Sequence, residues 1–498
     1  MLGRKQPSSK VINLFSRGDK IMKWDEETEV LIIGFGGAGA VAAVTAHDLG
    51  AKVLIVEKME KGGGSTNISK GGFLNLKDFA GGFRYLKNLC YRVSRGVEPE
   101  MIRIYAEECL KNREWLESRG ARTHVYGGAA FPQLSGEDSI EKRMITGPNS
   151  ENENAFWNFL RSRVESRNIT VWCRSPAKAL LTDSQGAVIG AVIQKEGKEK
   201  AVQAKKGIIL TCGGFEFDEW MKMNYLKGYP YYSLGTPGNT GDGIRMAQQV
   251  GADLWHMSGV STLLGFKAPE FEAAFMIRPA SYRYIFVDQQ GKRFASEFAD
   301  IHAYNFLVDF FDPHSLRYPR IPCFLIFDEV TRQTGPIGVT AIGYNRGRYA
   351  WSKDNGEEIR RGWILAGDTL AGLAQKTGLD RTFLEKTVDR YNQSCQRGED
   401  AEFHRPQDKL ASLGPGPYYA VKLWPCLINT QGGPRRNAKA QVLYPDGRPI
   451  PRLYSAGELG SLYGLLYQGA GNLGECLAFG RIAGREAAQE SLSGEKER

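Results

Sequence analysis

The segment 29–57 carries the pattern that most constrains how this chain can fold. It begins with EVLIIG (29–34), an apolar run rich in β-branched residues, as expected of a buried parallel strand. A GxGxxG motif follows at 34–39, then an alanine-rich run with a helical pattern that ends at Gly50, then a second strand that ends at Glu57. A strand, a glycine turn, a helix and a strand, with an acid about 20 residues on, predict a dinucleotide-binding unit.

The residues of this motif have distinct physical roles. Gly34 permits the tight turn, Gly36 lets the backbone approach a pyrophosphate, and Gly39 lets the helix pack on the strand. The N-terminus of the helix, with about half a positive charge, faces the phosphate. Glu57 is placed to accept hydrogen bonds from the hydroxyls of an adenosine ribose.

A second glycine-rich segment at 58–73 indicates which dinucleotide is bound. A second close backbone approach suits the long FAD molecule and is not needed for NAD. Strand and glycine-turn patterns recur at 207–215, 239–252 and 452–460, and their order favours FAD contacts over ordinary αβ turns. Glu458 is placed to hydrogen-bond the ribityl chain of the flavin. The residues predicted to contact FAD are Gly34, Gly36, Gly37, Ala38, Gly39, Glu57, Lys58, Ser65, Thr66, Asn67, Gly71, Gly72, Ala177, Gly213, Asp242, Gly457, Glu458, Gly474, Cys476 and Leu477.

Composition disfavours several other classes of protein. The net charge is +9, but Lys and Arg are spread along the chain without a dense basic run, so we expect no nucleic-acid partner. The 8 cysteines form no CxxC pair, which predicts no metal site and suits a reducing cytoplasm. No apolar run is long enough for a membrane span. Residues 1–25 are basic and polar, and we expect them to form a flexible N-terminal segment.

Together these motifs resemble the fumarate reductase/succinate dehydrogenase flavoprotein superfamily over about residues 27–490. The spacing from Gly63 to Gly72 is similar to the isoalloxazine loop of that family. Its covalently flavinylated members carry a histidine in this loop, whereas this chain has none between His47 and His124. The resemblance therefore implies FAD that is bound without a covalent bond.

Relatives that reduce fumarate carry three charged or ionisable anchors for the diacid, and this chain departs from all three. The resemblance puts Asn472 in the slot of one arginine, Asn429 in the slot of a histidine, and Ile301 in the slot of the proton-donating arginine. Each lost charge-assisted contact is worth about 1.5–3 kcal/mol. Fumarate and succinate are therefore not the expected substrates.

The segment 467–481 (YQGAGNLGECLAFGR) instead resembles the 3-ketosteroid dehydrogenase branch. That resemblance implies that the Tyr467 hydroxyl and the Gly471 N–H polarise a substrate ketone, and the alternative is a Tyr467 that packs in the core. A tyrosine of those enzymes, near the slot of Ile301, exchanges the α-proton. Tyr304 is the preferred replacement here, and His302 is the other main candidate; Tyr282 and Tyr284 also lie nearby.

These observations predict an α/β fold with a discontinuous architecture. Segments 26–260 and 416–498 are expected to form a Rossmann-like FAD-binding domain of the GR2 type, with a helix and a β-meander at 155–206. Segment 261–415 is rich in aromatic residues and is expected to form an inserted α+β capping and catalytic domain. An active site between such domains is typical of ligand-binding enzymes.

The predicted function is an FAD-dependent oxidoreductase that acts on a carbon–carbon bond next to a ketone. The preferred substrate is a small apolar ketone, such as a 3-ketosteroid or a bile-acid-like 3-oxo compound, and an unidentified electron donor or acceptor completes the reaction. The first rival is a reductase of another unsaturated acid or enone that is fed by a separate donor. A second rival is a flavin-bearing assembly subunit without a substrate of its own. The oligomeric state stays open.

Overall fold

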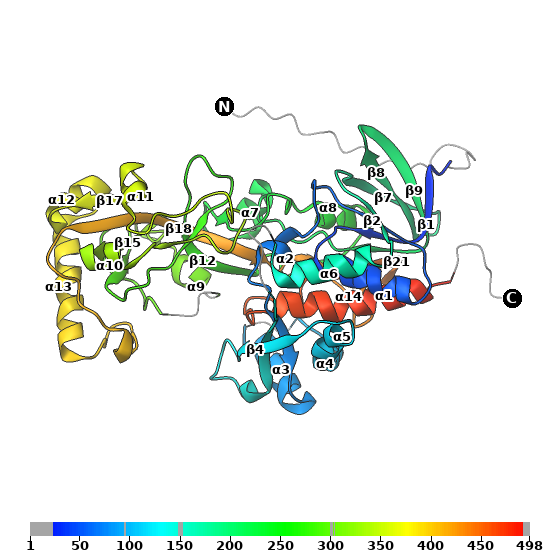
Figure 1. The fold of residues 1–498 in the computed structure, drawn as a ribbon, viewed down its shortest axis with the longest axis horizontal. Helices are drawn as coiled ribbons and strands as arrows, with labels where there is room; N and C mark the ends of the chain where they lie inside the picture. Colours follow the sequence, from blue (N-terminus) through cyan, green and yellow to red (C-terminus); the bar gives the residue numbers. More distant parts are fainter. Residues whose placement is uncertain (1–22, 94–95, 148–152, 299–301, 303, 492–498) are drawn as a thin grey trace.

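A parallel sheet forms the core of the larger part of the protein (Figure 1). The computed structural model describes residues 23–93, 96–147, 153–298, 302 and 304–491. In this sheet β21, β9, β1, β2 and β6 are parallel neighbours, and β20 pairs antiparallel with β21 at one edge. The strands are β20 (Gln441–Leu443), β21 (Pro449–Ser455), β9 (Lys198–Leu210), β1 (Glu26–Ile33), β2 (Val53–Val56) and β6 (Thr170–Trp172).

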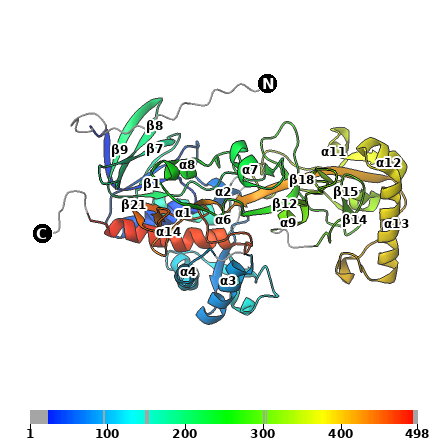
Figure 2. The ribbon, with the colours of Figure 1, turned by 180° about the vertical axis from the view of Figure 1, so that it is seen from behind.

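Two helices lie side by side against this sheet in both ribbon views (Figures 1 and 2): α1 (Gly37–Asp48) and α14 (Gly471–Gln489). Glycine permits their close contact, because a Cβ on Gly484 would lie 2.5 Å from the Ala42 carbonyl oxygen. A Cβ on Gly39 would lie 2.1 Å from the Gly34 carbonyl oxygen, so α1 can start this close to β1 only without a side chain there. Glycine thus serves helix packing as well as ligand approach.

A β-meander and a small antiparallel sheet extend this part of the protein. The meander consists of β7 (Ala177–Thr182), β8 (Val188–Lys195) and β9, and it follows α6 (Ala155–Glu165), as the sequence predicts for 155–206. The small sheet has the order β3-β5-β4 and lies with α3, α4 and α5 below α14 in Figure 1. These elements are β3 (Phe73–Leu76), α3 (Phe79–Val93), α4 (Pro99–Leu110), α5 (Asn112–Glu117), β4 (Thr123–Gly127) and β5 (Ile140–Ile145).

A second large sheet forms the other end of the elongated molecule (Figure 1), with the order β14-β15-β18-β12-β13-β16. Its strands are β12 (Val260–Phe266), β13 (Phe275–Ile277), β14 (Tyr284–Val287), β15 (Cys323–Asp328), β16 (Gly338–Val339) and β18 (Tyr418–Thr430), with β10 (Tyr232–Ser233) and β17 (Leu365–Gly367) also on β18. Its helices include α9 (Tyr304–Val308), α10 (Glu329–Thr334), α11 (Gly356–Arg360), α12 (Leu370–Thr377) and α13 (Arg381–Arg397). Aromatic side chains such as Phe275, Trp351 and Trp363 pack in its core.

The long strand β18 connects the two parts of the molecule. Its first residues pair with β15 and β17, and its last residues, Asn429 and Thr430, pair with the start of β12. The predicted return to the FAD-binding domain at 416 falls just before this strand, although β18 is central in the second sheet. We therefore propose that the second domain includes β18, and that the chain re-enters the first domain after Thr430.

The predicted α/β class, with a Rossmann-like unit and a largely inserted second unit, is confirmed. Among the described residues, no helix is both long enough and apolar enough to cross a membrane. In the same part of the chain, no group of 3 or more His, Cys, Asp or Glu side chains is arranged to hold a metal ion. Residues 1–22 of the predicted N-terminal segment lie outside the described residues.

Candidate active site

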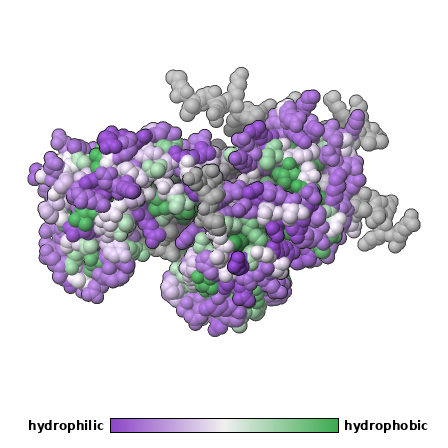
Figure 3. All heavy atoms as spheres, viewed as in Figure 1, coloured by the Kyte–Doolittle hydropathy of each residue, from purple (hydrophilic) through white to green (hydrophobic). Residues whose placement is uncertain are grey.

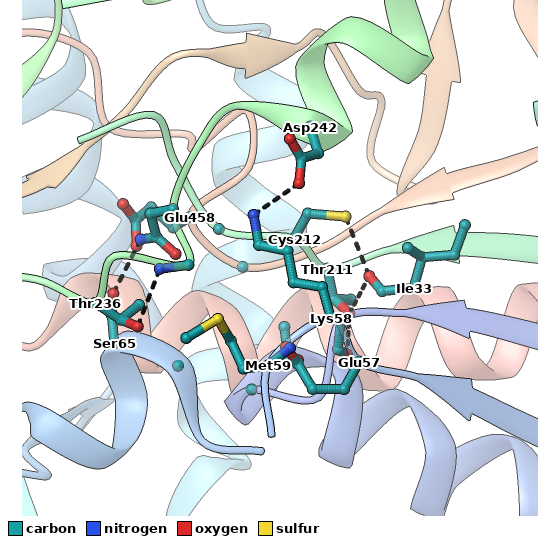
Figure 4. A pocket seen from close by; sticks show the side chains of 18 of the residues that line it. Ile33, Glu57, Lys58, Met59, Ser65, Thr211, Cys212, Thr236, Asp242 and Glu458 are labelled. Atoms are coloured by element: carbon teal, nitrogen blue, oxygen red, sulfur yellow. Dashed lines mark hydrogen bonds and ion pairs between the residues drawn. The ribbon is translucent and has the colours of Figure 1, made fainter. Parts of the chain in front are cut away.

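A cavity opens where the parallel strands end (Figure 4). It encloses about 810 Å³ of empty space, including the part open to solvent. Its lining comes from the ends of β1, β2, β9 and β21, from α2 (Gly64–Ile68), and from the segment before α8 (Asp242–Gln249). Ligands of open α/β sheets bind outside the carboxyl ends of the strands, which is this position. The predicted FAD contacts in the lining are Gly34, Gly36, Gly37, Ala38, Glu57, Lys58, Ser65, Thr66, Ala177, Gly213, Asp242, Gly457, Glu458 and Cys476.

The remaining predicted contacts lie outside this lining and are Gly39, Asn67, Gly71, Gly72, Gly474 and Leu477. Several of them are packing positions. A Cβ on Gly72 would lie 2.0 Å from the Tyr126 hydroxyl oxygen, and one on Gly474 would lie 2.8 Å from the Tyr105 hydroxyl oxygen. Leu477 is fully buried in the core between α1 and the small sheet.

Backbone hydrogen bonds hold the Glu57 carboxylate at the cavity. Its two oxygens accept from the N–H groups of Phe35 at 2.8 Å and Met59 at 2.7 Å. Burial raises the pKa of Glu57, and these two backbone bonds oppose that rise. The carboxylate retains acceptor capacity for a ribose hydroxyl, because each oxygen has a second lone pair.

Polar side chains from distant segments meet across the same cavity (Figure 4). The Lys58 ammonium lies 2.7 Å from the Asp242 carboxylate and donates to the Thr240 hydroxyl at 2.6 Å. The Asn239 amide donates to the Ser65 hydroxyl at 3.1 Å. These contacts tie the turn before α8 to the two glycine-rich segments near the N-terminus, so the predicted loops surround one space.

The residues present fit FAD. No atom lies within 4 Å of a Cβ built on Gly64, and the nearest to one on Gly36 is 3.8 Å away, so side chains at these positions would occupy the cavity. Two buried atoms on the residues that flank Thr430, whose N–H donates to the cavity-lining Glu458, have no hydrogen-bond partner within the described residues: Asn429 Oδ1 and Gln431 Nε2. Unpaired buried polar atoms are costly, and a long polar ligand supplies partners for such atoms.

Sequence reasoning missed part of the lining, namely Met59, Thr211, Cys212, Thr236 and Asn239. The signal for Thr211 and Cys212 was present, since they directly precede Gly213 at the end of a predicted strand. Asn239 begins the glycine turn at 239–252, which the sequence already indicated. Thr236 stands before that turn in a loop without strand periodicity, and only the tertiary fold brings it to the cavity.

Tyr467 lies at the N-terminal end of α14 and is almost completely buried. Its hydroxyl oxygen accepts the Asn472 N–H at 3.2 Å, and no described residue accepts its proton. Its ring packs edge to face against His302, with centroids 5.1 Å apart, and against Tyr463 at 5.4 Å. Burial raises the pKa of Tyr467 well above its usual value, so the phenol is neutral and can donate a hydrogen bond.

The Gly471 N–H, the predicted second donor to a ketone oxygen, already donates to the Gln468 carbonyl at 2.7 Å. The intervening Ala470 adopts a left-handed conformation with φ of 75°, which closes this turn before α14. Gly471 therefore adjoins Tyr467 as expected, but its N–H is occupied in this conformation. For the Gly471 N–H to bind a ketone, the turn must open, or the N–H must be shared between the ketone oxygen and the Gln468 carbonyl.

The structure separates the two main candidates for proton transfer. His302 packs on Tyr467, and its Nδ1 lies 2.7 Å from the Ser261 hydroxyl. A Cβ on Gly469 would lie 3.0 Å from His302 Nε2, so this nitrogen faces the loop that carries Tyr467. Tyr304 is buried in the core of the second sheet, and its hydroxyl donates to the Glu297 carbonyl at 3.0 Å. Ile301 lies outside the described residues.

Tyr282 and Tyr284 also lie away from this loop. The Tyr282 hydroxyl accepts from Lys409 at 3.0 Å and its ring packs on Phe298, whereas Tyr284 belongs to the core of the second sheet. Neither has a described contact with Tyr467.

Amide side chains fill the two described slots where fumarate-reducing relatives carry an arginine and a histidine. The Asn429 amide donates to Asn472 Oδ1, and the Asn472 amide donates to Gln431 Oε1 at 3.1 Å. All three side chains are buried. The backbone of Asn472 also contacts Tyr467, so this amide cluster and the phenol form one group of uncharged polar side chains. The Asn472 amide also donates to the Glu475 carboxylate at 3.4 Å.

Tyr126 on β4 is a second phenol that sequence reasoning missed. Its hydroxyl lies against Gly72, and burial raises its pKa to about 12. A negative charge on the Tyr126 phenolate would raise the pKa of Tyr467, so the two side chains lie close enough to interact electrostatically. Tyr126 stands far from every predicted motif, so no sequence signal pointed to it.

Comparisons with known proteins agree with this site. A family model described as an FAD binding domain matches residues 29–473. An NADH:fumarate oxidoreductase of Klebsiella pneumoniae (strain 342) is 26% identical over 481 residues, which cover 93% of this chain but only 48% of that protein. A 3-oxosteroid 1-dehydrogenase of Mycobacterium tuberculosis is 27% identical over 590 residues, which cover 94% of this chain and 99% of that protein.

The fold also matches solved structures. One is the 3-ketosteroid Δ1-dehydrogenase of Sterolibacterium denitrificans in complex with 1,4-androstadiene-3,17-dione, with a TM-score of 0.82 and 24% identity, covering 93% of this chain and 100% of that one. The matched family region includes most of the chain and surrounds the cavity that fits FAD. The chain therefore belongs to this FAD binding domain family, within the fumarate reductase/succinate dehydrogenase flavoprotein superfamily.

Proposed function

We propose that the protein adds or removes hydrogen across a carbon–carbon bond conjugated to a ketone, in a 3-oxosteroid or a similar apolar polycyclic substrate. The observation that carries this proposal is the group of uncharged polar side chains formed by Tyr467, Asn429 and Asn472. A diacid needs cationic partners, whereas a ketone needs one neutral donor in an apolar pocket. Tyr467 is that donor, because its O–H has no described acceptor.

FAD, when bound, supplies the hydride exchange at the β-carbon. The side chains supply the rest of the chemistry. Tyr467 donates its hydrogen bond to the ketone oxygen and stabilises the negative charge that develops there. His302 exchanges the α-proton through Nε2, and Ser261 orients the ring by accepting a hydrogen bond from Nδ1–H. This assignment prefers His302 to Tyr304, whose hydroxyl is engaged with Glu297.

The similarity to a 3-oxosteroid 1-dehydrogenase over nearly the full length of both chains supports the proposal. The similarity to an NADH:fumarate oxidoreductase supports the rival, a reductase of an unsaturated acid or enone. This chain spans about half of that relative. An unidentified electron donor or acceptor is part of either proposal. We propose the cytoplasm as the location, because the 8 cysteines are scattered along the chain without a CxxC pair.

An anaerobic screen tests the proposal. Oxidised enzyme is mixed with saturated 3-oxosteroids, and reduced enzyme with 3-oxo-enes, fumarate and other unsaturated acids, while the flavin absorbance is recorded. We expect 3-oxo compounds to bleach or restore the flavin band and fumarate to leave it unchanged. Reoxidation by an acid without any response to ketones would favour the rival. No response to any compound would favour the assembly subunit.

Acid denaturation tests how FAD is held. No histidine stands in the segment 58–73 that contributes to the cavity, so we expect FAD to bind without a covalent bond. Precipitation of the holoenzyme with trichloroacetic acid should release all of the yellow colour into the supernatant. Flavin fluorescence that stays with the protein band on a denaturing gel would contradict this expectation.

A further inference from the structure

Two buried carboxyl groups meet beside the cofactor cavity. Glu216 follows the glycine turn after β9, and Glu458 follows the end of β21 and lines the cavity. Both accept from the same N–H, that of Thr430, at 3.1 Å for Glu216 Oε1 and 3.2 Å for Glu458 Oε1. A Cβ on Gly214 would lie 2.7 Å from Glu458 Oε1 and 3.0 Å from Glu216 Oε2, so glycine there makes room for both groups.

The charged neighbours of this pair do not neutralise it. The buried Arg436 forms an ion pair with Glu475 at 2.7 Å and donates to the Gly457 and Leu459 carbonyls. Glu475 on α14 adds a further negative charge near Glu458. Tyr467 in the loop before α14 and Cys476 on α14 are ionisable groups that interact with Glu458, and burial raises the pKa of both, so both are neutral.

Two carboxylates in one buried site do not both ionise near neutral pH. Glu216 Oε2 is buried without a hydrogen-bond partner, which a proton on Glu458 would supply. Burial raises the pKa of Glu458 well above its usual value, and the adjacent Glu216 carboxylate raises it further. The contacts of the two carboxyl groups and the charges around them therefore both indicate that Glu216 and Glu458 hold one proton between them.

We propose that Glu216 and Glu458 share one proton at the FAD site, and that Glu216 is a positioning residue that keeps Glu458 neutral beside the cofactor. The inference rests on FAD binding and not on the proposed substrate. Loss of the shared proton would put two negative charges beside a ligand that already carries a pyrophosphate. FAD binding is then coupled to protonation of the pair.

The sign of the coupling follows from linkage. If the FAD complex binds the shared proton more tightly than the free protein does, the affinity for FAD is complete below the pKa of the pair and falls as the pH rises through it. For a single proton the dissociation constant rises by at most about tenfold per pH unit. Buried glutamic acids titrate as high as about pH 8–9, which sets the range to examine.

The test measures the FAD dissociation constant of the holoenzyme, from flavin fluorescence on dilution, between about pH 6 and 9. For the wild type we expect the constant to rise with pH. Glu216→Gln removes the shared charge but keeps the shape, so its constant should stay flat over the same range. Glu219→Gln, on the exposed surface of α7 (Glu219–Tyr225), is the matched control and should follow the wild type.

A constant that does not change with pH in the wild type, or a Glu216→Gln variant with the wild-type slope, would overturn the proposal. If Glu216→Gln does not fold, the infrared spectrum of the wild-type holoenzyme decides. We expect the carbonyl band of a protonated carboxylic acid that persists above the usual pKa of glutamic acid and disappears at high pH. Absence of that band near neutral pH would overturn the proposal as well.

Discussion

Replacement of Tyr467 by phenylalanine is expected to lower turnover of a 3-oxo substrate by roughly ten- to a thousandfold, as the loss of one oxyanion donor does in other enzymes. The ring would keep its edge-to-face contacts with His302 and Tyr463, so the loop should keep its shape. The substitution removes the O–H that has no described acceptor, together with the oxygen that accepts the Asn472 N–H at 3.2 Å. Steady-state kinetics should show the loss in kcat and in kcat/KM together, with FAD content unchanged.

Tyr463→Phe is the matched control for this variant. Tyr463 belongs to the same loop and is fully buried, but its hydroxyl lies 3.1 Å from that of Tyr105 and not in the group of uncharged polar side chains around Tyr467. We expect turnover close to the wild type and a small loss of thermal stability from the broken hydrogen bond. Full activity of Tyr467→Phe, or an equal loss in both variants, would remove the proposed role of the Tyr467 phenol.

The cofactor side of the site was largely predictable from sequence, for a physical reason. The turns at Gly34–Gly39 and Gly63–Gly64 use glycine where a side chain would clash or fill the cavity, and this requirement is local. Such positions can be recognised without any knowledge of tertiary contacts. The prediction of FAD and of the superfamily is confirmed.

The substrate side was less predictable, because its geometry depends on contacts between distant segments. Sequence spacing preferred Tyr304 for proton transfer, but the fold buries Tyr304 under β14 and brings His302 to Tyr467 instead. Similarly, the turn that Ala470 closes engages the Gly471 N–H, and no pattern in the sequence signals that bond. Tyr126 comes from a strand more than 300 residues before Tyr467 and could be found only in the structure.

The contact between Asn429 and Asn472 joins two positions that only the resemblance to a known family singled out. The two residues stand 43 positions apart, and each was singled out only because relatives carry a charged or ionisable group in its slot. Their direct hydrogen bond puts the two slots in one place. The two amides therefore stand at one site. On the face that Figure 3 shows, hydrophobic residues form small patches among hydrophilic ones.

Replacement of His302 by glutamine is expected to lower turnover by about 10²- to 10⁴-fold, the range in which loss of a general acid or base falls. Glutamine keeps a polar group near Ser261 but has no basic nitrogen to take the α-proton. The polarised ketone would remain bound, so the substrate dissociation constant should change little. A single-turnover measurement of flavin reduction separates this loss in the chemical step from any loss in binding.

His256→Gln is the control for His302→Gln. His256 is also largely buried, but its Nδ1 lies 2.8 Å from the Ser461 carbonyl, and its ring stacks on Trp255 and not on Tyr467. Ser261→Ala should fall between the two, because it leaves the His302 imidazole in place without the group that orients it. If His302→Gln reduces the flavin at the wild-type rate while Tyr304→Phe does not, proton transfer belongs to Tyr304 and the assignment to His302 is wrong.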